Sequence, residues 1–223
     1  MEITWLSHSS FRLRSGSTTL IADPFPDSLG VSMPAGLREA QVVTVSNSHP
    51  NHSASHLLNG DSVLLNGPGE YEVASLYIKG VRTPLAQPPP EEEGENGSQW
   101  NTIFTIEMDG LVVCHLGDLG GPITSRQIEE LLSPQVLMIP VGGDCTLSPE
   151  EAAEVVNVIS PRVVIPMHYK VPGVSSGLEG LAPFIKALGT KPQETQSRLN
   201  VTQANLPGEI QVVVLHAAAV SSP

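Results

Sequence analysis

Short apolar runs separated by turn residues dominate the chain, and most of them have the length of a strand. Runs at 3–6, 10–14 and 18–22 predict the first three strands, and a Ser-Gly-Ser turn should join the last two as a hairpin. Further strands are predicted at 42–45, 62–65, 75–79, 101–107, 111–116, 136–141, 162–166 and 209–216. The pattern therefore indicates a protein built mainly of β-sheet.

Helical signals are fewer and come later in the chain. Ser148 precedes Pro149 and stands three residues before Glu151, so a serine cap, a proline at the first helical position and a capping glutamate predict a helix over 149–159. Two more helices suit 124–133 and 178–188. Sheets with helices packed on the outside are the expected arrangement.

The whole chain, 1–223, is predicted to form one domain with two irregular segments. Residues 87–98 combine prolines, glutamates and glycines and cannot bury enough apolar surface to order themselves, so they predict an acidic surface loop. An insertion between two strands is favoured over a lid for this loop. The tail at 217–223 is expected to fray.

Composition limits the role that a metal could have. With 223 residues and 40% hydrophobic content, the chain can bury a core without disulfides or structural metals. A bound metal would therefore serve function. The two cysteines lack C-x-x-C spacing and the N-terminus lacks the features of a signal peptide, so a reduced, cytoplasmic setting is expected.

Charge and hydropathy narrow the choice of partners. No apolar run reaches the roughly 18 residues of a membrane span, and a net charge of −12 disfavours both nucleic acid and anionic membranes. A small-molecule substrate is the expected partner, and the oligomeric state is left open.

Five predicted strands end in polar or glycine-rich groups, which we expect to converge on one cleft. These groups lie at 47–52, 67–71, 117–118, 142–144 and 167–169. The residues expected to line a substrate cleft are Gly69, Glu70, Gly142, Gly143 and Asp144. Asp144 could also replace a ligand or a base, although aspartate in a glycine-rich turn is ordinary turn chemistry.

Histidines and one carboxylate in these groups predict a metal site. His52, Asp118 and His168 would supply two imidazoles and a carboxylate, a ligand set that suits zinc and leaves positions for water. His115 points to the opposite face of its strand and is expected to be a hydrogen-bonded histidine between layers. His8 either marks a strand edge or faces the cleft. Asp118, and after it His8, are the candidate catalytic residues.

The chain resembles the metallo-β-lactamase fold superfamily, specifically its small cytoplasmic metal-dependent hydrolases. The resemblance rests on the segments 5–11, 22–25, 46–52, 67–72, 101–104, 114–120, 140–143 and 165–170. It implies an α/β fold, a four-layer αββα sandwich of two mixed β-sheets flanked by helices, with a metal site where strand ends meet.

The resemblance also implies that the metal site is incomplete. The family carries H-x-H-x-D-H, which places Asn47 at the first histidine, His49 at the second, Asn51 at the aspartate and His52 at the last. A further family histidine is missing, and Leu85 is assigned to its place. The surviving implied ligands are His49, His52, Asp118 and His168.

Two functions follow from this reduced set. The first is a hydrolase with one divalent metal, zinc first, with manganese, iron or nickel as alternatives, that cleaves an ester, lactone or phosphoester. The second is a degenerate member that has lost catalysis and acts as a binding or scaffold protein, and the metal can then be absent. The remaining polar groups of the cleft are compatible with both.

Overall fold

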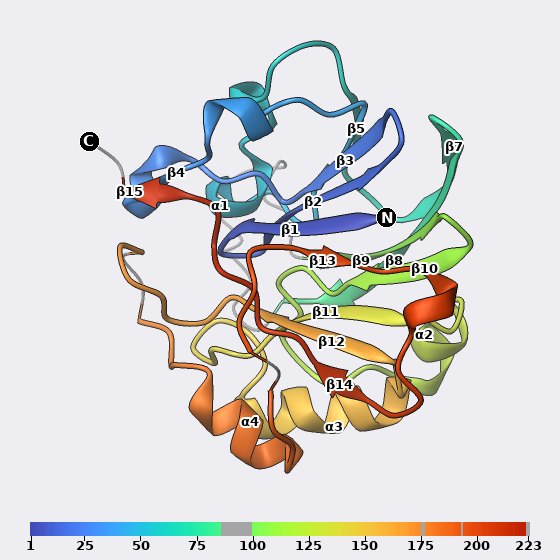
Figure 1. The fold of residues 1–223 in the computed structure, drawn as a ribbon, viewed down its shortest axis with the longest axis vertical. Helices are drawn as coiled ribbons and strands as arrows, with labels where there is room; N and C mark the ends of the chain where they lie inside the picture. Colours follow the sequence, from blue (N-terminus) through green and yellow to red (C-terminus); the bar gives the residue numbers. More distant parts are fainter. Residues whose placement is uncertain (86–99, 175–176, 193, 222–223) are drawn as a thin grey trace.

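Two mixed β-sheets face each other in the computed structural model, which describes residues 1–85, 100–174, 177–192 and 194–221 (Figure 1). The first sheet has the order β13-β1-β2-β3-β5-β6, and the second has the order β14-β12-β11-β10-β9-β8-β7. The predicted sandwich of two mixed sheets with flanking helices is confirmed.

The strands of the first sheet come mostly from the N-terminal third. They are β1 (Glu2–Ser7), β2 (Ser10–Ser15), β3 (Thr18–Ala22), β5 (Val42–Thr44), β6 (Val63–Leu65) and β13 (Leu199–Asn200). A small separate sheet pairs β4 (Val31–Ser32) with β15 (Val220–Ser221). Strands β1, β2 and β3 are antiparallel neighbours, whereas β3, β5 and β6 run parallel.

The strands of the second sheet follow along the chain. They are β7 (Gly69–Val73), β8 (Leu76–Pro84), β9 (Trp100–Met108), β10 (Leu111–His115), β11 (Val136–Pro140), β12 (Val163–Met167) and β14 (Gln211–Val212). Strands β7 to β10 are antiparallel neighbours, and β10, β11, β12 and β14 run parallel.

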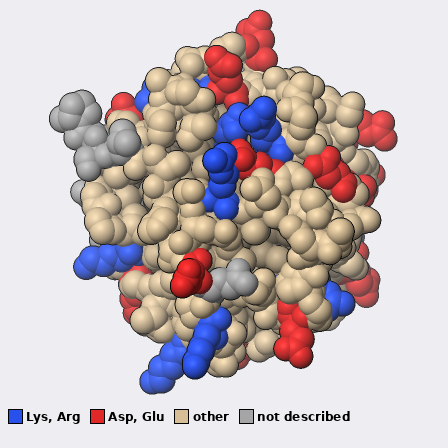
Figure 2. Space-filling model, viewed as in Figure 1, with Lys and Arg blue, Asp and Glu red and all other residues tan. Residues whose placement is uncertain are grey.

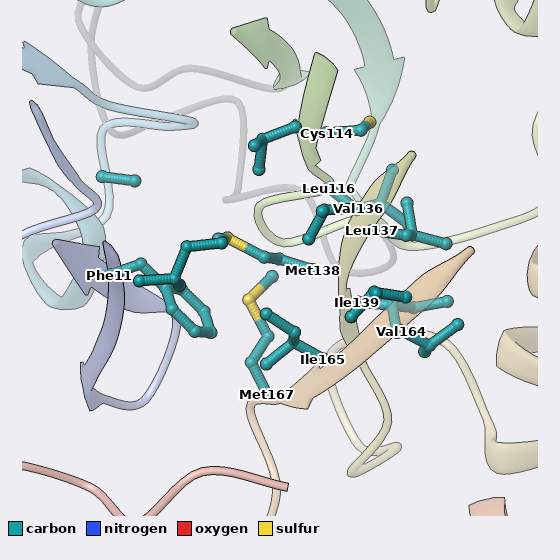
Figure 3. Packing of buried hydrophobic residues seen from close by; sticks show 14 of the residues in the cluster. Phe11, Cys114, Leu116, Val136, Leu137, Met138, Ile139, Val164, Ile165 and Met167 are labelled. Carbon is teal, nitrogen blue, oxygen red and sulfur yellow. The ribbon is translucent and has the colours of Figure 1, made fainter. Parts of the chain in front are cut away.

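The main core fills the space between the two sheets. Phe11 of β2 lies opposite Met138 of β11 and Met167 of β12, and all three side chains are fully buried (Figure 3). A second apolar cluster, which includes Ile21 and Phe25, lies on the outer face of the first sheet. Burial of the apolar side chains in these two clusters stabilises the fold without requiring a metal.

Helices cover the second sheet on its outer side. They are α2 (Ser125–Glu129), α3 (Pro149–Ile159) and α4 (Ala182–Leu188), and a short α1 (Pro50–Ser53) lies beside the first sheet (Figure 1). Helix α3 matches the prediction to the residue, because Ser148 and Glu151 form the expected reciprocal cap, with N–O distances of 2.9 and 3.2 Å.

The other two predicted helices are shorter than expected. The first ends early because Leu132 and Ser133 adopt left-handed backbone conformations, with φ of 57° and 52°. The second begins late because Glu179 pairs its backbone with Gly142 and Lys170 instead. Both segments therefore contribute loops where helix was predicted.

The C-terminal segment is tied down, which corrects the predicted frayed tail for residues 218–221. The backbone N–H groups of Ala218 and Ala219 donate to the carbonyls of Trp5 and Leu6, each at 2.8 Å. Strand β15 then pairs with β4. The predicted acidic loop at 87–98 lies outside the described residues.

Charged side chains are distributed in small groups over the face shown in Figure 2, which has no continuous basic surface. The net charge of −12 comes from 23 acidic against 11 basic residues. Within the described ranges, no helix has the length and apolar character needed to cross a membrane.

Candidate metal centre

The polar cluster lies where parallel strands of both sheets end. Asp23 follows β3, Ser46 follows β5, and Asp118 comes soon after β10. The loop at 141–147 follows β11, and His168 follows β12 directly. Parallel strands present their carboxyl ends at one edge, so residues far apart in the chain meet here.

His52 is held in one orientation by a buried carboxylate. Its Nδ1 lies 2.8 Å from Asp23 Oδ2, and Asp23 also accepts hydrogen bonds from Ser46 N at 2.8 Å and Ser46 Oγ at 2.6 Å. Asp23 and His52 are 0% and 2% exposed. With its Nδ1 proton donated to Asp23, His52 keeps Nε2 free as a ligand atom, the arrangement that orients histidine ligands in metal sites.

Electrostatics support this pairing. Burial lowers the pKa of His52, but the carboxylates of Asp118 and Asp23 outweigh burial and leave the pKa raised. Burial raises the pKa of Asp23, yet His115, His52 and Ser46 outweigh it and leave that pKa lowered. Asp23 is therefore held as a carboxylate.

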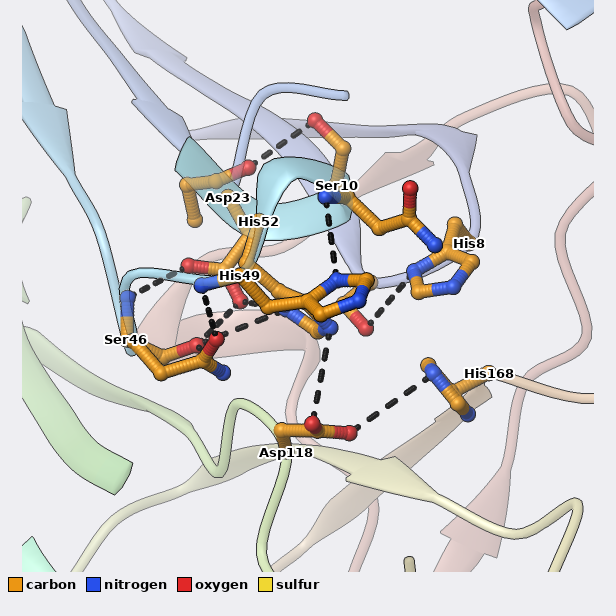
Figure 4. Close-up of polar contacts among 12 residues, drawn as sticks. His8, Ser10, Asp23, Ser46, His49, His52, Asp118 and His168 are labelled. Carbon is orange, nitrogen blue, oxygen red and sulfur yellow. Dashed lines mark hydrogen bonds and ion pairs between the residues drawn. The ribbon is translucent and has the colours of Figure 1, made fainter. Parts of the chain in front are cut away.

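The Asp118 carboxylate lies between two buried imidazoles (Figure 4). His52 Nε2 is 3.7 Å from Asp118 Oδ2, and His168 Nε2 is 3.7 Å from Asp118 Oδ1. These separations are too long for hydrogen bonds. They are close to the roughly 3.3–3.6 Å that separates two ligand atoms of one tetrahedral zinc ion.

Two buried atoms of this cluster lack a partner. Asp118 Oδ1 and His168 Nδ1 make no hydrogen bond within the described part of the chain. Burial in particular lowers the pKa of His168 to about 4, so its ring is neutral at neutral pH, the form that binds metals. The imidazoles of His52 and His168 and the carboxylate of Asp118 therefore offer the donor types that divalent first-row ions bind.

His8 faces this cluster, which decides between the two placements that the sequence left open. Its ring centroid lies 4.1 Å from that of His168 and 5.1 Å from that of His52. Ligand atoms of the three histidines lie within 4.8 Å of one another. Residue 8 has a left-handed backbone, with φ of 52°, which turns the chain between β1 and β2 toward the site.

His49 lies at the rim and is not brought to ligand distance. It is exposed and caps α1, with its Nδ1 accepting from the backbone N–H of Asn51 at 3.2 Å. Its ring centroid is 6.3 Å from that of His52. Among the described residues it belongs to neither of the two groups whose ligand atoms converge.

The substituted ligand positions have local structural roles. Asn47 is buried, accepts from the backbone N–H of His49 at 2.9 Å and donates to Ser46 Oγ at 3.3 Å. Asn51 is half-buried in α1, and Leu85 follows the end of β8. The amide at position 47 thus stabilises the loop that carries His52.

The expected cleft residues fall into two places. Gly142 lies against the backbone of His168, where an added Cβ would come within 2.3 Å of its carbonyl oxygen. Gly143 and Asp144 continue this loop in left-handed conformations, with Asp144 exposed. These three residues therefore adjoin the histidine cluster.

Gly69 and Glu70 are placed elsewhere, in edge strand β7. Glu70 lies 3.6 Å from Lys79, and among the contacts of the described residues none joins Glu70 to the histidines. The segment forms a strand and not a cleft loop because it pairs with β8 in antiparallel register.

Several residues of the site were not predicted. Asn101 accepts from the backbone N–H of Asp118 at 2.9 Å and donates to the Leu116 carbonyl at 2.9 Å, so it fixes the turn that carries Asp118. Asp23 was given no role from the sequence beyond its place in the segment 22–25, although it follows an apolar strand as the predicted groups do. Cys145 also lies near the cluster, and no sequence signal distinguished it.

The structure places His115 as predicted, as a buried, hydrogen-bonded histidine between layers of the fold. It is fully buried, and its Nε2 lies 2.7 Å from the Ser9 carbonyl oxygen. Burial lowers its pKa, and the Asp23 carboxylate and the Ser9 carbonyl oppose that shift. It thus links the end of β10 to the turn between β1 and β2, and among the described residues it belongs to neither group of converging ligand atoms.

Comparison with known proteins agrees with this geometry. A family model described as a beta-lactamase superfamily domain matches residues 2–168. The chain belongs to the metallo-β-lactamase superfamily. Within it, the chain is 32% identical over 199 residues to a UPF0173 metal-dependent hydrolase from Methanoculleus marisnigri, covering 80% of this chain and 86% of the relative.

Solved structures of the superfamily share the fold. A candidate Zn-dependent hydrolase of the metallo-β-lactamase superfamily from Thermotoga maritima is 34% identical and aligns with a TM-score of 0.74 over 96% of this chain and 97% of that one. A metallo hydrolase from Ignicoccus hospitalis, 19% identical, aligns with a TM-score of 0.63 over 100% and 98% of the two chains. The second likeness concerns the fold alone.

Proposed function

We propose that the protein is a hydrolase that works with one divalent metal ion, zinc first, held by His52, Asp118 and His168. The observation that carries this proposal is the Asp118 carboxylate, 3.7 Å from each of two buried imidazole nitrogens and within hydrogen-bond distance of neither. Relatives of this chain are described as metal-dependent hydrolases, which supports metal-dependent hydrolysis as its reaction.

The donor set favours zinc. Imidazole nitrogen suits zinc and also iron and nickel, and the single carboxylate suits manganese as well. When bound, such an ion acts as a Lewis acid that lowers the pKa of water from 15.7 toward roughly 7. An ester, lactone or phosphoester is the expected substrate, because each has an electrophilic centre that activated water can attack.

The protein's own groups would orient and desolvate the reacting centre. Asp23 keeps the Nδ1 proton of His52 in place, and the burial of His168 keeps that ring neutral. Burial and the neighbouring His168 lower the pKa of His8, so its ring is also neutral, and the same shift makes it a weak base. The reason to consider it is its place beside His52 and His168. We assign His8 as the candidate base and Asp118 as the central ligand.

One ion is proposed, because the residues of the family's other position do not offer donors. Asn47 is engaged in the loop, and Leu85 has no donor atom. His49 uses Nδ1 to cap α1. The hydrogen bonds of Asn47 also favour the second candidate function, a degenerate binding protein. They explain the asparagine by the stability of the loop, without any role in metal binding or catalysis.

A hydrolysis screen tests the proposal. Zinc-loaded protein should hydrolyse at least one member of a panel of aryl esters, lactones and phosphodiesters, and the activity should disappear on chelation and return with zinc. Asp118→Asn should abolish it, whereas Asp61→Asn on the exposed surface should leave it unchanged. Zinc binding without hydrolysis of any class would favour the degenerate binding protein.

A further inference from the structure

Cys145 lies beside the proposed ion on a loop that is fixed to the Asp118 segment. Its Sγ and the ligand atoms of Asp118 and His168 all lie within 4.8 Å of one another. The backbone N–H of Leu147 donates to the carbonyl of Leu119 at 3.1 Å, and the backbone N–H of Gly143 donates to the carbonyl of Leu147 at 3.2 Å. These bonds tie the loop at 143–147 to the chain that carries Asp118.

We propose that Cys145 supplies a thiolate ligand to the same ion as Asp118 and His168. The inference rests on the proposed metal site and adds a donor that the surviving histidine and aspartate set does not contain. Asp118 Oδ1 and Nδ1 of the 2%-exposed His168 have no hydrogen-bond partner within the described ranges, and a buried polar atom without a partner is what an available metal ligand presents.

The charge of the site supports a sulfur ligand. With Asn51 in place of an aspartate, the proposed set of His52, Asp118 and His168 carries only one negative charge. A Cys145 thiolate would bring the total to two, which balances a divalent ion. Binding would form the sulfur–metal bond from a sulfur lone pair and release the thiol proton to solvent.

Sulfur also selects the metal. Thiolate is a soft ligand that favours zinc over the hard ions magnesium and manganese. Zinc sometimes expands from four ligands to five, so a sulfur ligand remains compatible with water at the site. The proposal therefore narrows the metals that the site would accept to those that bind sulfur well.

Other roles for Cys145 fit the structure less well. Burial, followed by the carboxylates of Asp118 and Asp144, raises the pKa of its thiol to about 11, which does not suit a free nucleophile. The other cysteine, Cys114, is fully buried in the core and is free, so a disulfide with it does not form here.

Cobalt substitution tests the proposal without an activity assay. Protein loaded with one equivalent of Co²⁺ should show a thiolate-to-cobalt charge-transfer band in the near ultraviolet. Cys145→Ala should lose this band, whereas Cys114→Ala, which removes the other thiol, should keep it. A wild-type complex that binds cobalt without the band would overturn the sulfur ligand and leave the proposed hydrolase standing.

Metal affinity gives a second, independent readout. Cys145→Ala should bind zinc at least roughly tenfold more weakly. Losing even a residue that only supports a metal ligand costs roughly 10- to 100-fold in affinity, and a direct ligand should cost no less. Cys145→Asp should recover binding and shift preference from zinc toward manganese, because it exchanges a soft donor for a hard one. Unchanged zinc affinity in Cys145→Ala would contradict the proposal. Absence of any metal binding in the wild type would overturn both the ligand and the one-metal hydrolase.

Discussion

His52 depends on Asp23 for its orientation, and the pair meets across 29 residues of chain. Removing the charge of Asp23 leaves the Nδ1 proton of His52 with a weaker acceptor. Asp23→Asn should therefore lower zinc affinity by roughly 10- to 100-fold, as loss of such partners typically does. Competition titration with a chromophoric chelator measures this. Unchanged affinity would show that Asp23 does not position the ligand.

Burial of His168 predicts how stability depends on pH in the metal-free protein. The pKa of its imidazole falls from 6.5 in the unfolded chain to about 4 in the folded protein. Between these two pH values the imidazole is protonated in the unfolded chain but not in the folded one, so lowering the pH favours unfolding. His168 thus stabilises the fold fully above pH 6.5, and this contribution should be lost progressively between pH 6.5 and about 4. The slope from one such group is about 1.4 kcal/mol per pH unit.

Thermal unfolding across this pH range checks the contribution. His168→Gln should show a shallower loss of stability than the wild type, because glutamine does not titrate. His216→Gln, at an exposed position, serves as the control and should keep the wild-type slope. Equal slopes for all three proteins would contradict the assignment of His168 as a buried neutral ring.

The sequence predicted the central residues of the site but not their supports. His52, Asp118 and His168 were expected to meet because each lies in a polar group that follows an apolar strand. In the structure Asp118 lies 3.7 Å from each of the two imidazoles. Asn101 could not be predicted in the same way. Its side chain spans from the start of β9 to the turn after β10, a contact set by sheet register.

At the scale of elements, the turn after β10 positions the site through close packing. Gly117 has φ of 59°, and an added Cβ would lie 2.4 Å from both Asn101 Oδ1 and Ser46 Cβ. Gly117→Ala should destabilise the fold by about 2–4 kcal/mol, from left-handed strain and overpacking together. Chemical denaturation measures this change.

Gly121, a few residues further along, provides a matched control. An added Cβ there meets nothing within 4 Å, and its backbone is not left-handed. Gly121→Ala should therefore change the free energy of unfolding by less than about 0.5 kcal/mol. If both variants unfolded alike, the close approach at Gly117 would not matter for stability.

Local signals predicted elements well where they were complete. Helix α3 has a serine cap, a proline at its start and a glutamate three residues after the cap, and its bounds were right. Residues 178–181 carried no such start signal, and long-range backbone pairing at Glu179 replaced helix there. Glu70 was misplaced because sequence alone does not show that its segment pairs with β8.

For the whole molecule, the core should persist without metal. Apolar side chains fill the space between the sheets, and only the polar cluster at one edge would lose contacts. Chelator-treated protein should keep its far-UV circular dichroism and unfold cooperatively, at a lower midpoint than the zinc-loaded form, because binding stabilises the folded state. Loss of secondary structure on chelation would show that the metal is structural.

Metal content per chain tests the central claim most directly. Protein purified without a chelator or a metal-carrying tag would be measured by elemental analysis, beside His168→Ala and the surface control His216→Ala. We predict about one equivalent of a divalent first-row metal in the wild type and in the control, and its loss in His168→Ala. No metal in the wild type, even after soaking in excess zinc, would contradict the one-metal hydrolase.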